Sequence, residues 1–365
     1  MRSLEIAYFF PRISETFVSD VVLGLRRKGV LTEVYSRFDP SKTRAREDTE
    51  IESQIHPELA STSIKIHYET DISSSPVFRR LVVASCYDVI HFHFGEMLCE
   101  VAGYVHSDAK LFATLHTKKH LESLIACARQ QPENVLSKAI LLPTSDYLSK
   151  LCAPLKKYVA GIVTHKLGTD TQFFRPVARK AANEKLTFLI NGRFVEKKNH
   201  KDVLKALSEV LEKGVNAHLV MIGDGVLSGK IHSLVNRLEL SNNVTFSGKV
   251  AKEEVRELYQ CADVTLQPSI TDDTGDEEGL PTTIMEYSAM GIPTIAYPSA
   301  GIPEIVKDGK TGLLVENVSQ LSRAMIRLAK DEILRHQMGK NARLFVEEGY
   351  NQERSIEKLR AIYYG

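Results

Sequence analysis

Strand-like apolar runs alternate with helical patterns along the whole of this 365-residue chain. Such alternation is typical of parallel sheets whose strands are joined by helices on both faces. One complete unit runs from residues 186–190 through a helix with apolar positions from Val203 to Leu211, ended by Gly214, to residues 217–222. Strands are expected at residues 4–9, 31–36, 63–67, 88–92, 111–115, 139–144, 162–166, 186–190, 217–222, 244–246, 264–266, 294–296 and 312–315.

The length exceeds one ordinary core and suits two α/β domains. The strand–helix pattern breaks near residues 168–185, where turn-forming residues precede a short polar stretch. Open α/β sheets bind ligands beyond the carboxyl ends of their strands, so two doubly wound domains facing each other would enclose a cleft. We expect an N-terminal domain at 1–169, a C-terminal domain at 170–345 and a final segment at 346–365.

Composition restricts the functional classes. The 47 basic and 46 acidic residues leave a net charge of +1, so no nucleic-acid partner is expected. The five cysteines are odd in number and form no C-x-x-C pair, which favours a reducing cytoplasm over a disulfide framework or structural zinc. No apolar run reaches about 18 residues and no signal-type segment opens the chain. We expect a cytoplasmic protein that does not span a membrane.

The most informative segment is residues 268–312. Glu278 and Glu286 stand eight positions apart within it, separated by Gly279-Leu280-Pro281, which is typical of a helix start. Glu278 would then lie in the loop before the helix, and Glu286 inside it. A helix N-terminus carries unsatisfied N–H groups and partial positive charge, and therefore suits a sugar diphosphate. The alternative for Glu278 is a solvated acidic loop with its neighbours Asp272, Asp273, Asp276 and Glu277.

Further candidates follow the strands of the second half. Arg193 and Lys198, after the strand ending at Ile190, offer a planar fork and a compact charge that both suit phosphate oxygens. Basic loop residues are also commonly just solvated. The turn Gly223-Asp224-Gly225 follows the next strand and leaves its backbone open to a ligand.

In the first half, the segment from Phe10 to Phe17 ends the first strand, where doubly wound domains often place a ligand loop. It lacks the G-x-G-x-x-G pattern, and Ser14 suits a helix N-cap equally well. His91, His93 and His116 end two later strands. Their spacing does not show a matched metal geometry, and His91 and His93 can simply share one strand face. We therefore expect no metal site.

Together these segments resemble glycosyltransferase family 4, whose members are retaining enzymes of the GT-B fold. The resemblance covers nearly the whole chain. Phe10-Pro11, Ser14-Glu15-Thr16-Phe17 and His91-Phe92-His93-Phe94-Gly95 look most like the bacterial branch that builds exopolysaccharide and capsule repeat units. The rest is carried by Gly168-Thr169-Asp170, Phe174-Arg175-Pro176, Gly192-Arg193, Lys198, Pro268-Ser269, Gly275-Asp276, the E-x7-E block from Glu278 to Glu286, Gly291-Ile292-Pro293 and Gly301-Ile302-Pro303-Glu304.

This resemblance implies two Rossmann-like doubly wound domains facing across a cleft, with the last helix crossing back to the first domain. It implies metal-independent transfer of a hexose-type sugar, with a UDP-sugar donor favoured, to a glycan or lipid-linked oligosaccharide in polysaccharide biosynthesis. No cofactor is expected, and the protein would contact the inner membrane face peripherally.

The resemblance also implies roles for individual residues. Arg193 and Lys198 would hold the diphosphate, Glu278 the transferred sugar and Glu286 the ribose, while His116 would face the donor sugar. The implied catalytic set is His116, Arg193, Lys198 and Glu278. The implied donor-binding set is Gly192, Arg193, Lys198, Gly223, Gly248, Lys249, Val250, Glu278, Gly279, Leu280, Pro281, Thr282 and Glu286, and the acceptor side is Ser14, Glu15, Thr16 and His93.

Three residues depart from the family pattern. Asn199 and Thr117 stand where glycine is usual, and Tyr287 stands where alanine is customary. Two other functions remain open: a nucleotide-sugar epimerase on the same two-domain plan, and a catalytically silent sugar-nucleotide-binding scaffold. The presence of both acidic and both basic positions argues against the scaffold.

Overall fold

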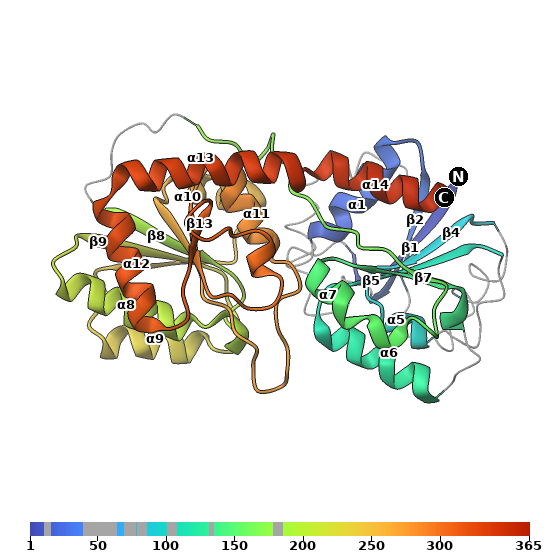
Figure 1. The fold of residues 1–365 in the computed structure, drawn as a ribbon, viewed down its shortest axis with the longest axis horizontal. Coiled ribbons are helices and arrows are strands. Elements are labelled where there is room, and N and C mark those ends of the chain that lie inside the picture. Colours follow the sequence, from blue (N-terminus) through green and yellow to red (C-terminus); the bar gives the residue numbers. More distant parts are fainter. Residues whose placement is uncertain are drawn as a thin grey trace. The chain divides into compact units, whose positions relative to one another are not determined.

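The computed structural model describes residues 1–10, 16–38, 64–68, 78, 86–100, 108–130, 135–177 and 185–365. The chain divides into two compact units, each with its own parallel sheet (Figure 1). The first unit comprises residues 1–167 and 353–365, and the second comprises residues 168–352. Among the described helices, none is both long enough and apolar enough to cross a membrane.

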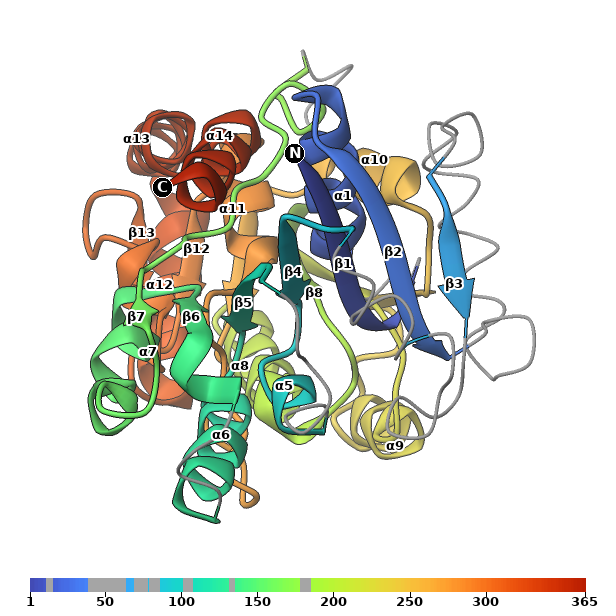
Figure 2. The same ribbon diagram turned by 90° about the vertical axis from the view of Figure 1, so that its right-hand side faces the viewer.

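The first unit is built on a sheet with the strand order β3-β2-β1-β4-β5-β6-β7. The order reverses between β1 and β4, which lie side by side (Figure 2), and doubly wound folds bind ligands at such a switch point. Its strands are β1 (Arg2–Phe9), β2 (Leu31–Phe38), β3 (Ile66–Tyr68), β4 (Val89–Phe92), β5 (Lys110–Leu115), β6 (Ala139–Pro143) and β7 (Gly161–Ile162), and its helices include α1 (Thr16–Arg27), α5 (Met97–Glu100), α6 (Lys118–Gln130), α7 (Asp146–Leu151) and α14 (Gln352–Tyr364).

The second unit repeats this plan with the strand order β10-β9-β8-β11-β12-β13. Its switch point lies between β8 and β11. The strands are β8 (Leu186–Asn191), β9 (Ala217–Ile222), β10 (Val244–Gly248), β11 (Val264–Gln267), β12 (Thr294–Ala296) and β13 (Gly312–Leu314), and the helices are α8 (His200–Glu212), α9 (Ser228–Arg237), α10 (Lys252–Gln260), α11 (Thr282–Ala289), α12 (Val318–Lys330) and α13 (Glu332–Gly349).

Each expected strand range overlaps a strand of the structure, and all the recorded pairings are parallel. The apolar stripe of α8 is fully buried at Val203, Leu207 and Val210. Gly214, in the left-handed region at φ +75°, follows that helix as predicted. The prediction of two doubly wound α/β domains is therefore confirmed.

The final segment differs from the prediction. Residues 346–349 form the last turn of α13, and the final helix begins at Gln352. The last hydrogen bond of α13 runs from the Tyr350 N–H to the Val346 carbonyl. The helix ends there because the Gln352 N–H donates to the Thr169 carbonyl instead of to α13. From Glu353 onward the chain belongs to the first unit. Ile356 packs against Gly24 of α1 so closely that a Cβ on Gly24 would lie 2.0 Å from Ile356 Cδ1.

Candidate functional site

Two of the predicted charged residues of the second unit, Lys198 and Glu278, meet beyond the carboxyl end of β8. Lys198 Nζ lies 2.7 Å from Glu278 Oε1. Burial acts to raise the pKa of Glu278, but the charges of Lys198, Lys197 and Arg193 hold it below its usual value. The site therefore holds an ionised carboxylate among cations, with little exposure to water.

Glycines line the loops beside this ion pair. A Cβ on Gly192 would lie 3.2 Å from the side chain of Lys198, and one on Gly223, at φ +123°, would lie 2.3 Å from the Gly192 carbonyl oxygen. The Gly223 N–H donates to the Gly248 carbonyl over 2.8 Å. The ends of β8, β9 and β10 thus approach one another through glycine backbone, and the missing side chain of Gly192 makes room for the side chain of Lys198.

Asn199 accounts for one departure from the family pattern. It adopts the left-handed conformation at φ 53°, which glycine reaches more easily than other residues. Its side-chain amide donates to Asp202 Oδ2 over 2.8 Å. Because asparagine tolerates this conformation better than most residues, the turn between Lys198 and α8 is kept without a glycine.

The acidic loop before α11 is closed and tied to the basic segment. Asp272 Oδ1 accepts hydrogen bonds from the backbone of Thr274 and Asp276 over 2.9 and 3.0 Å. Asp276 in turn pairs with Lys197 Nζ over 2.9 Å, and Lys197 is only 6% exposed. The alternative of a simply solvated acidic loop therefore does not describe Glu278, which the loop brings to Lys198.

The second glutamate of the block lies in α11. Pro281 is the N-cap of this helix and provides no side-chain cap. One Glu286 oxygen, Oε2, accepts a hydrogen bond from Tyr259 Oη over 2.9 Å. The hydroxyl of Tyr287, the unusual residue after this glutamate, accepts from the Asn191 N–H over 2.8 Å. The remaining predicted donor residues lie in the same loops: Gly279, Leu280 and Thr282 at the start of α11, and Lys249 and Val250 directly after β10.

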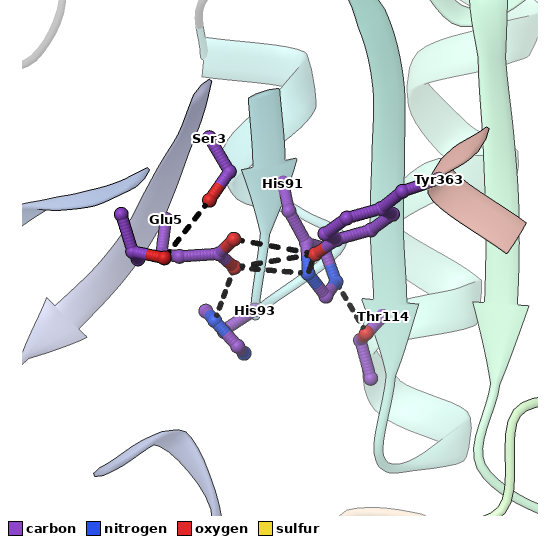
Figure 3. A network of polar contacts seen from close by, with 7 residues as sticks. Ser3, Glu5, His91, His93, Thr114 and Tyr363 are labelled. Atoms are coloured by element: carbon purple, nitrogen blue, oxygen red, sulfur yellow. Dashed lines mark hydrogen bonds and ion pairs between the residues drawn. The ribbon is translucent and has the colours of Figure 1, made fainter. Parts of the chain in front are cut away.

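In the first unit, His91 and His93 share one face of β4 and its extension, as predicted. Both are buried against Glu5 of β1: His91 Nδ1 and His93 Nε2 lie 3.1 and 3.0 Å from Glu5 Oε2 (Figure 3). The Tyr363 hydroxyl lies 2.6 Å from His91 Nδ1, and Thr114 Oγ1 lies 2.7 Å from His91 Nε2. Burial acts to raise the pKa of Glu5, but hydrogen bonds from both histidines lower it to about 2.

Sequence reasoning missed Glu5 and Tyr363. The available signal was a lone carboxylate near the start of the apolar run from Leu4 to Phe9. The ligand-type atoms of Glu5, His91 and His93 lie within 4.8 Å of one another, and each has a hydrogen-bonding partner within the network. The absence of a metal stays a prediction.

His116 follows β5, with its ring 4.3 Å from that of Phe17. Burial, and next the charge of His120, hold the pKa of His116 well below its usual value, so the imidazole is neutral. Its Nε2 atom is buried and has no hydrogen-bonding partner among the described residues. Ser14 and Glu15 lie outside the described residues, as does the side chain of Thr16, which begins α1.

Comparison with known proteins agrees with this architecture. The family model "Glycosyl transferases group 1" matches residues 172–345. The chain is 33% identical over 223 residues to the putative colanic acid biosynthesis glycosyltransferase WcaL of Escherichia coli, covering 59% of this chain and 53% of that protein. It is 30% identical over 272 residues to a GDP-mannose-dependent monoacylated α-(1-6)-phosphatidylinositol monomannoside mannosyltransferase of Corynebacterium glutamicum, covering 69% of each.

The fold has close counterparts among solved structures. Anabaena Alr3699/HepE, crystallised with UDP and glucose, aligns with a TM-score of 0.77 at 15% identity over 99% of both chains. Sucrose-phosphate synthase from Thermosynechococcus elongatus aligns with a TM-score of 0.75 at 18% identity over 100% of this chain and 98% of that one. At this identity the likeness establishes the GT-B fold alone.

The matched region spans about half the length of the colanic acid relatives. The mannosyltransferase match, in contrast, extends over more than two thirds of both proteins. Together with the family model over the second unit, that match shows that this chain belongs to the glycosyl transferases group 1 family of transferase enzymes.

Proposed function

We propose that this chain is a retaining family 4 glycosyltransferase that moves a hexose-type sugar from a nucleotide-sugar donor to a glycan or lipid-linked acceptor in polysaccharide biosynthesis. The observation that carries the proposal is the meeting of Lys198 with Glu278 beside Arg193. A cation pair suits a diphosphate, and a buried ionised carboxylate suits sugar hydroxyls. The first turn of α11 adds N–H groups and partial positive charge.

The proposed transfer uses no metal and no covalent enzyme intermediate. The acceptor oxygen attacks the anomeric carbon on the face from which the diphosphate leaves, and a leaving diphosphate oxygen takes the acceptor's proton. Arg193 and Lys198 stabilise the charge that develops on the diphosphate, an electrostatic contribution that is commonly the largest in catalysis. We propose that His116, a neutral imidazole whose buried Nε2 has no hydrogen-bonding partner among the described residues, serves a hydroxyl of the donor sugar.

A UDP-sugar is the favoured donor. Supporting it, the structurally similar Anabaena protein was crystallised with UDP and glucose. The mannosyltransferase relative is named as GDP-mannose-dependent, so guanine is the main competitor. The polysaccharide assignment is supported by the names of the colanic acid relative and of the amylovoran biosynthesis glycosyltransferase AmsK of Erwinia amylovora. We place the enzyme in the cytoplasm, with peripheral contact at the inner membrane face.

The test is the thermal stability of the full chain with UDP, GDP and ADP, each with and without a chelator. A ligand present at 100 times its dissociation constant and bound only by the folded state adds about 2.7 kcal/mol. We expect UDP to raise the melting temperature, EDTA to leave that rise intact, and Glu286→Ala to abolish it. No rise with any nucleotide would overturn the donor site, and a rise that EDTA removes would overturn metal independence.

The reaction itself is tested by incubating the UDP-sugar with and without acceptor oligosaccharides and following the anomeric carbon by NMR. We expect the product to keep the donor's anomeric configuration. Inversion would contradict the retaining mechanism. Isomerisation of the donor in the absence of acceptor would instead identify a nucleotide-sugar epimerase.

A further inference from the structure

A chain of hydrogen bonds joins the two halves of the proposed donor site inside the second unit. Asn191 immediately precedes Gly192 and Arg193 of the diphosphate-binding loop. Its side-chain amide donates to Tyr259 Oη over 2.7 Å, and that hydroxyl donates to Glu286 Oε2 over 2.9 Å. A residue of α10 thus connects the end of β8 to the glutamate of α11.

The direction of these bonds is fixed by chemistry. An amide NH2 group can only donate and an ionised carboxylate can only accept, so the Tyr259 hydroxyl must accept from Asn191 and give its proton to Glu286. Burial, followed by the negative charge of Glu286, raises the pKa of Tyr259 well above its usual value and keeps that proton in place. The ring of Tyr259 is fully buried.

Tyr287 holds the other side of Asn191. The recorded pairing between β8 and β11 ends at Leu189 with Thr265, and the Asn191 N–H, two residues later, donates to Tyr287 Oη over 2.8 Å. The rings of Tyr259 and Tyr287 meet edge to face with centroids 4.9 Å apart. Asn191 is therefore held through both its backbone and its side chain.

We infer that Tyr259 is a positioning residue for nucleotide recognition, which fixes the carboxylate of Glu286 for the ribose hydroxyls and couples it through Asn191 to the diphosphate-binding loop. This inference rests on the proposed function, in which Glu286 contacts the ribose. A carboxylate already held by a hydrogen bond from a buried phenol loses less freedom when it binds a ligand.

The test compares the binding of UDP and 2′,3′-dideoxy-UDP by calorimetry. The dissociation constant of the dideoxy nucleotide divided by that of UDP measures what the ribose hydroxyls contribute to binding. The variant Tyr259→Phe removes one oxygen and keeps the ring in its packing. We expect the ratio to fall by a factor of about 3 to 10, because only part of the energy of a hydrogen bond to a charged group reaches the ligand. Binding of the dideoxy nucleotide should change far less.

Tyr297→Phe is the matched control. Tyr297 is also buried in the second unit and its hydroxyl also donates to a carboxylate, Asp202 Oδ2, over 3.0 Å. We expect this variant to keep the wild-type ratio. Asn191→Ala leaves the Tyr259 hydroxyl in place without its hydrogen-bond donor, and should lower the ratio less than Tyr259→Phe does. This second variant keeps the inference testable even if Tyr259→Phe is poorly folded.

The outcomes separate the inference from the proposed function. If the wild-type chain binds neither nucleotide, the proposed function fails. If Glu286→Gln lowers the ratio while Tyr259→Phe and Asn191→Ala both leave it at the wild-type value, only the positioning role is overturned. The positioning role is supported if Tyr259→Phe lowers the ratio while its melting temperature without ligand is at least as high as that of Tyr297→Phe. A loss of stability alone would not change the discrimination between the two nucleotides.

Discussion

Lys198 contributes the charge most directly placed for catalysis, since its ammonium lies 2.7 Å from the carboxylate proposed to contact the sugar. We expect Lys198→Ala to lower kcat by a factor on the order of 100, as happens when one donor to a developing negative charge is removed. Steady-state kinetics with saturating donor measures this. Lys205→Ala is the control, because Lys205 is exposed on α8, and its turnover should match wild type. An unchanged kcat in Lys198→Ala would contradict the electrostatic mechanism.

His200 should make the second unit sensitive to acid. Burial lowers the pKa of His200 to about 3, and neither ring nitrogen has a hydrogen-bonding partner among the described residues. Its ordinary pKa is about 6.5. Between these values the unfolded chain binds a proton that the folded chain does not, so stability falls as the pH drops from about 6.5 towards 3.

We therefore expect His200→Phe, which keeps an aromatic ring beside Phe194, to flatten the loss of stability over this range by about 1.4 kcal/mol per pH unit. Urea unfolding at a series of pH values measures it. The control is the region above pH 7, where the two proteins should show parallel curves. Equal slopes in acid would show that His200 titrates normally.

At the scale of elements, the sequence predicted what depends on local pattern. Apolar runs gave the strands, and the helical stripe from Val203 gave α8, because burial of these faces is set by periodicity of 2 or 3.6 residues. The E-x7-E block likewise indicated a loop followed by α11. The join of α13 to α14 was misplaced because it depends on hydrogen bonds with the distant residue Thr169, which no local pattern reveals.

The same reasoning explains which parts of the site escaped prediction. The contact between Tyr259 and Glu286, and that between Glu5 and Tyr363, join elements far apart in the chain. A buried tyrosine hydroxyl looks like any other aromatic position until its partner is known. Glycines and charged loop residues were easier to predict, since they directly follow strands whose ends are visible in the sequence.

Helix α14 is attached to the sheet of the first unit partly by one hydroxyl. Tyr363 Oη lies 2.6 Å from His91 Nδ1 and 3.3 Å from Glu5 Oε1, all inside the core. We expect Tyr363→Phe to lower the free energy of unfolding by about 1–3 kcal/mol, the cost of leaving buried polar groups without a partner. Denaturant unfolding measures it. The neighbouring Tyr364 is 56% exposed, so Tyr364→Phe should stay within about 0.5 kcal/mol of wild type.

For the whole molecule, the two units differ in how the chain builds them. The second unit is one continuous segment, residues 168–352, with its own buried clusters and every predicted donor-binding residue. The first unit needs both ends of the chain, because Ile356, Leu359 and Tyr363 of α14 complete a core cluster with residues of α1, β4, β5 and β6. We therefore expect the second unit, but not residues 1–167 alone, to fold as a separate fragment.

We expect a fragment of residues 168–352 to unfold cooperatively and to bind UDP, and a fragment of residues 1–167 to be unstable. Full burial of an aliphatic or aromatic side chain contributes about 1.5–3 kcal/mol, so losing Ile356, Leu359 and Tyr363 removes an amount comparable with the roughly 5–15 kcal/mol by which domains are stable. Circular dichroism melts and calorimetry of both fragments measure this. A synthetic peptide of residues 353–365, marginal as a helix alone, should raise the stability of the 1–167 fragment, whereas one carrying Leu359→Asp should not. A stable 1–167 fragment that gains nothing from the peptide would show that α14 is dispensable, and the unit boundary would then have to end before it.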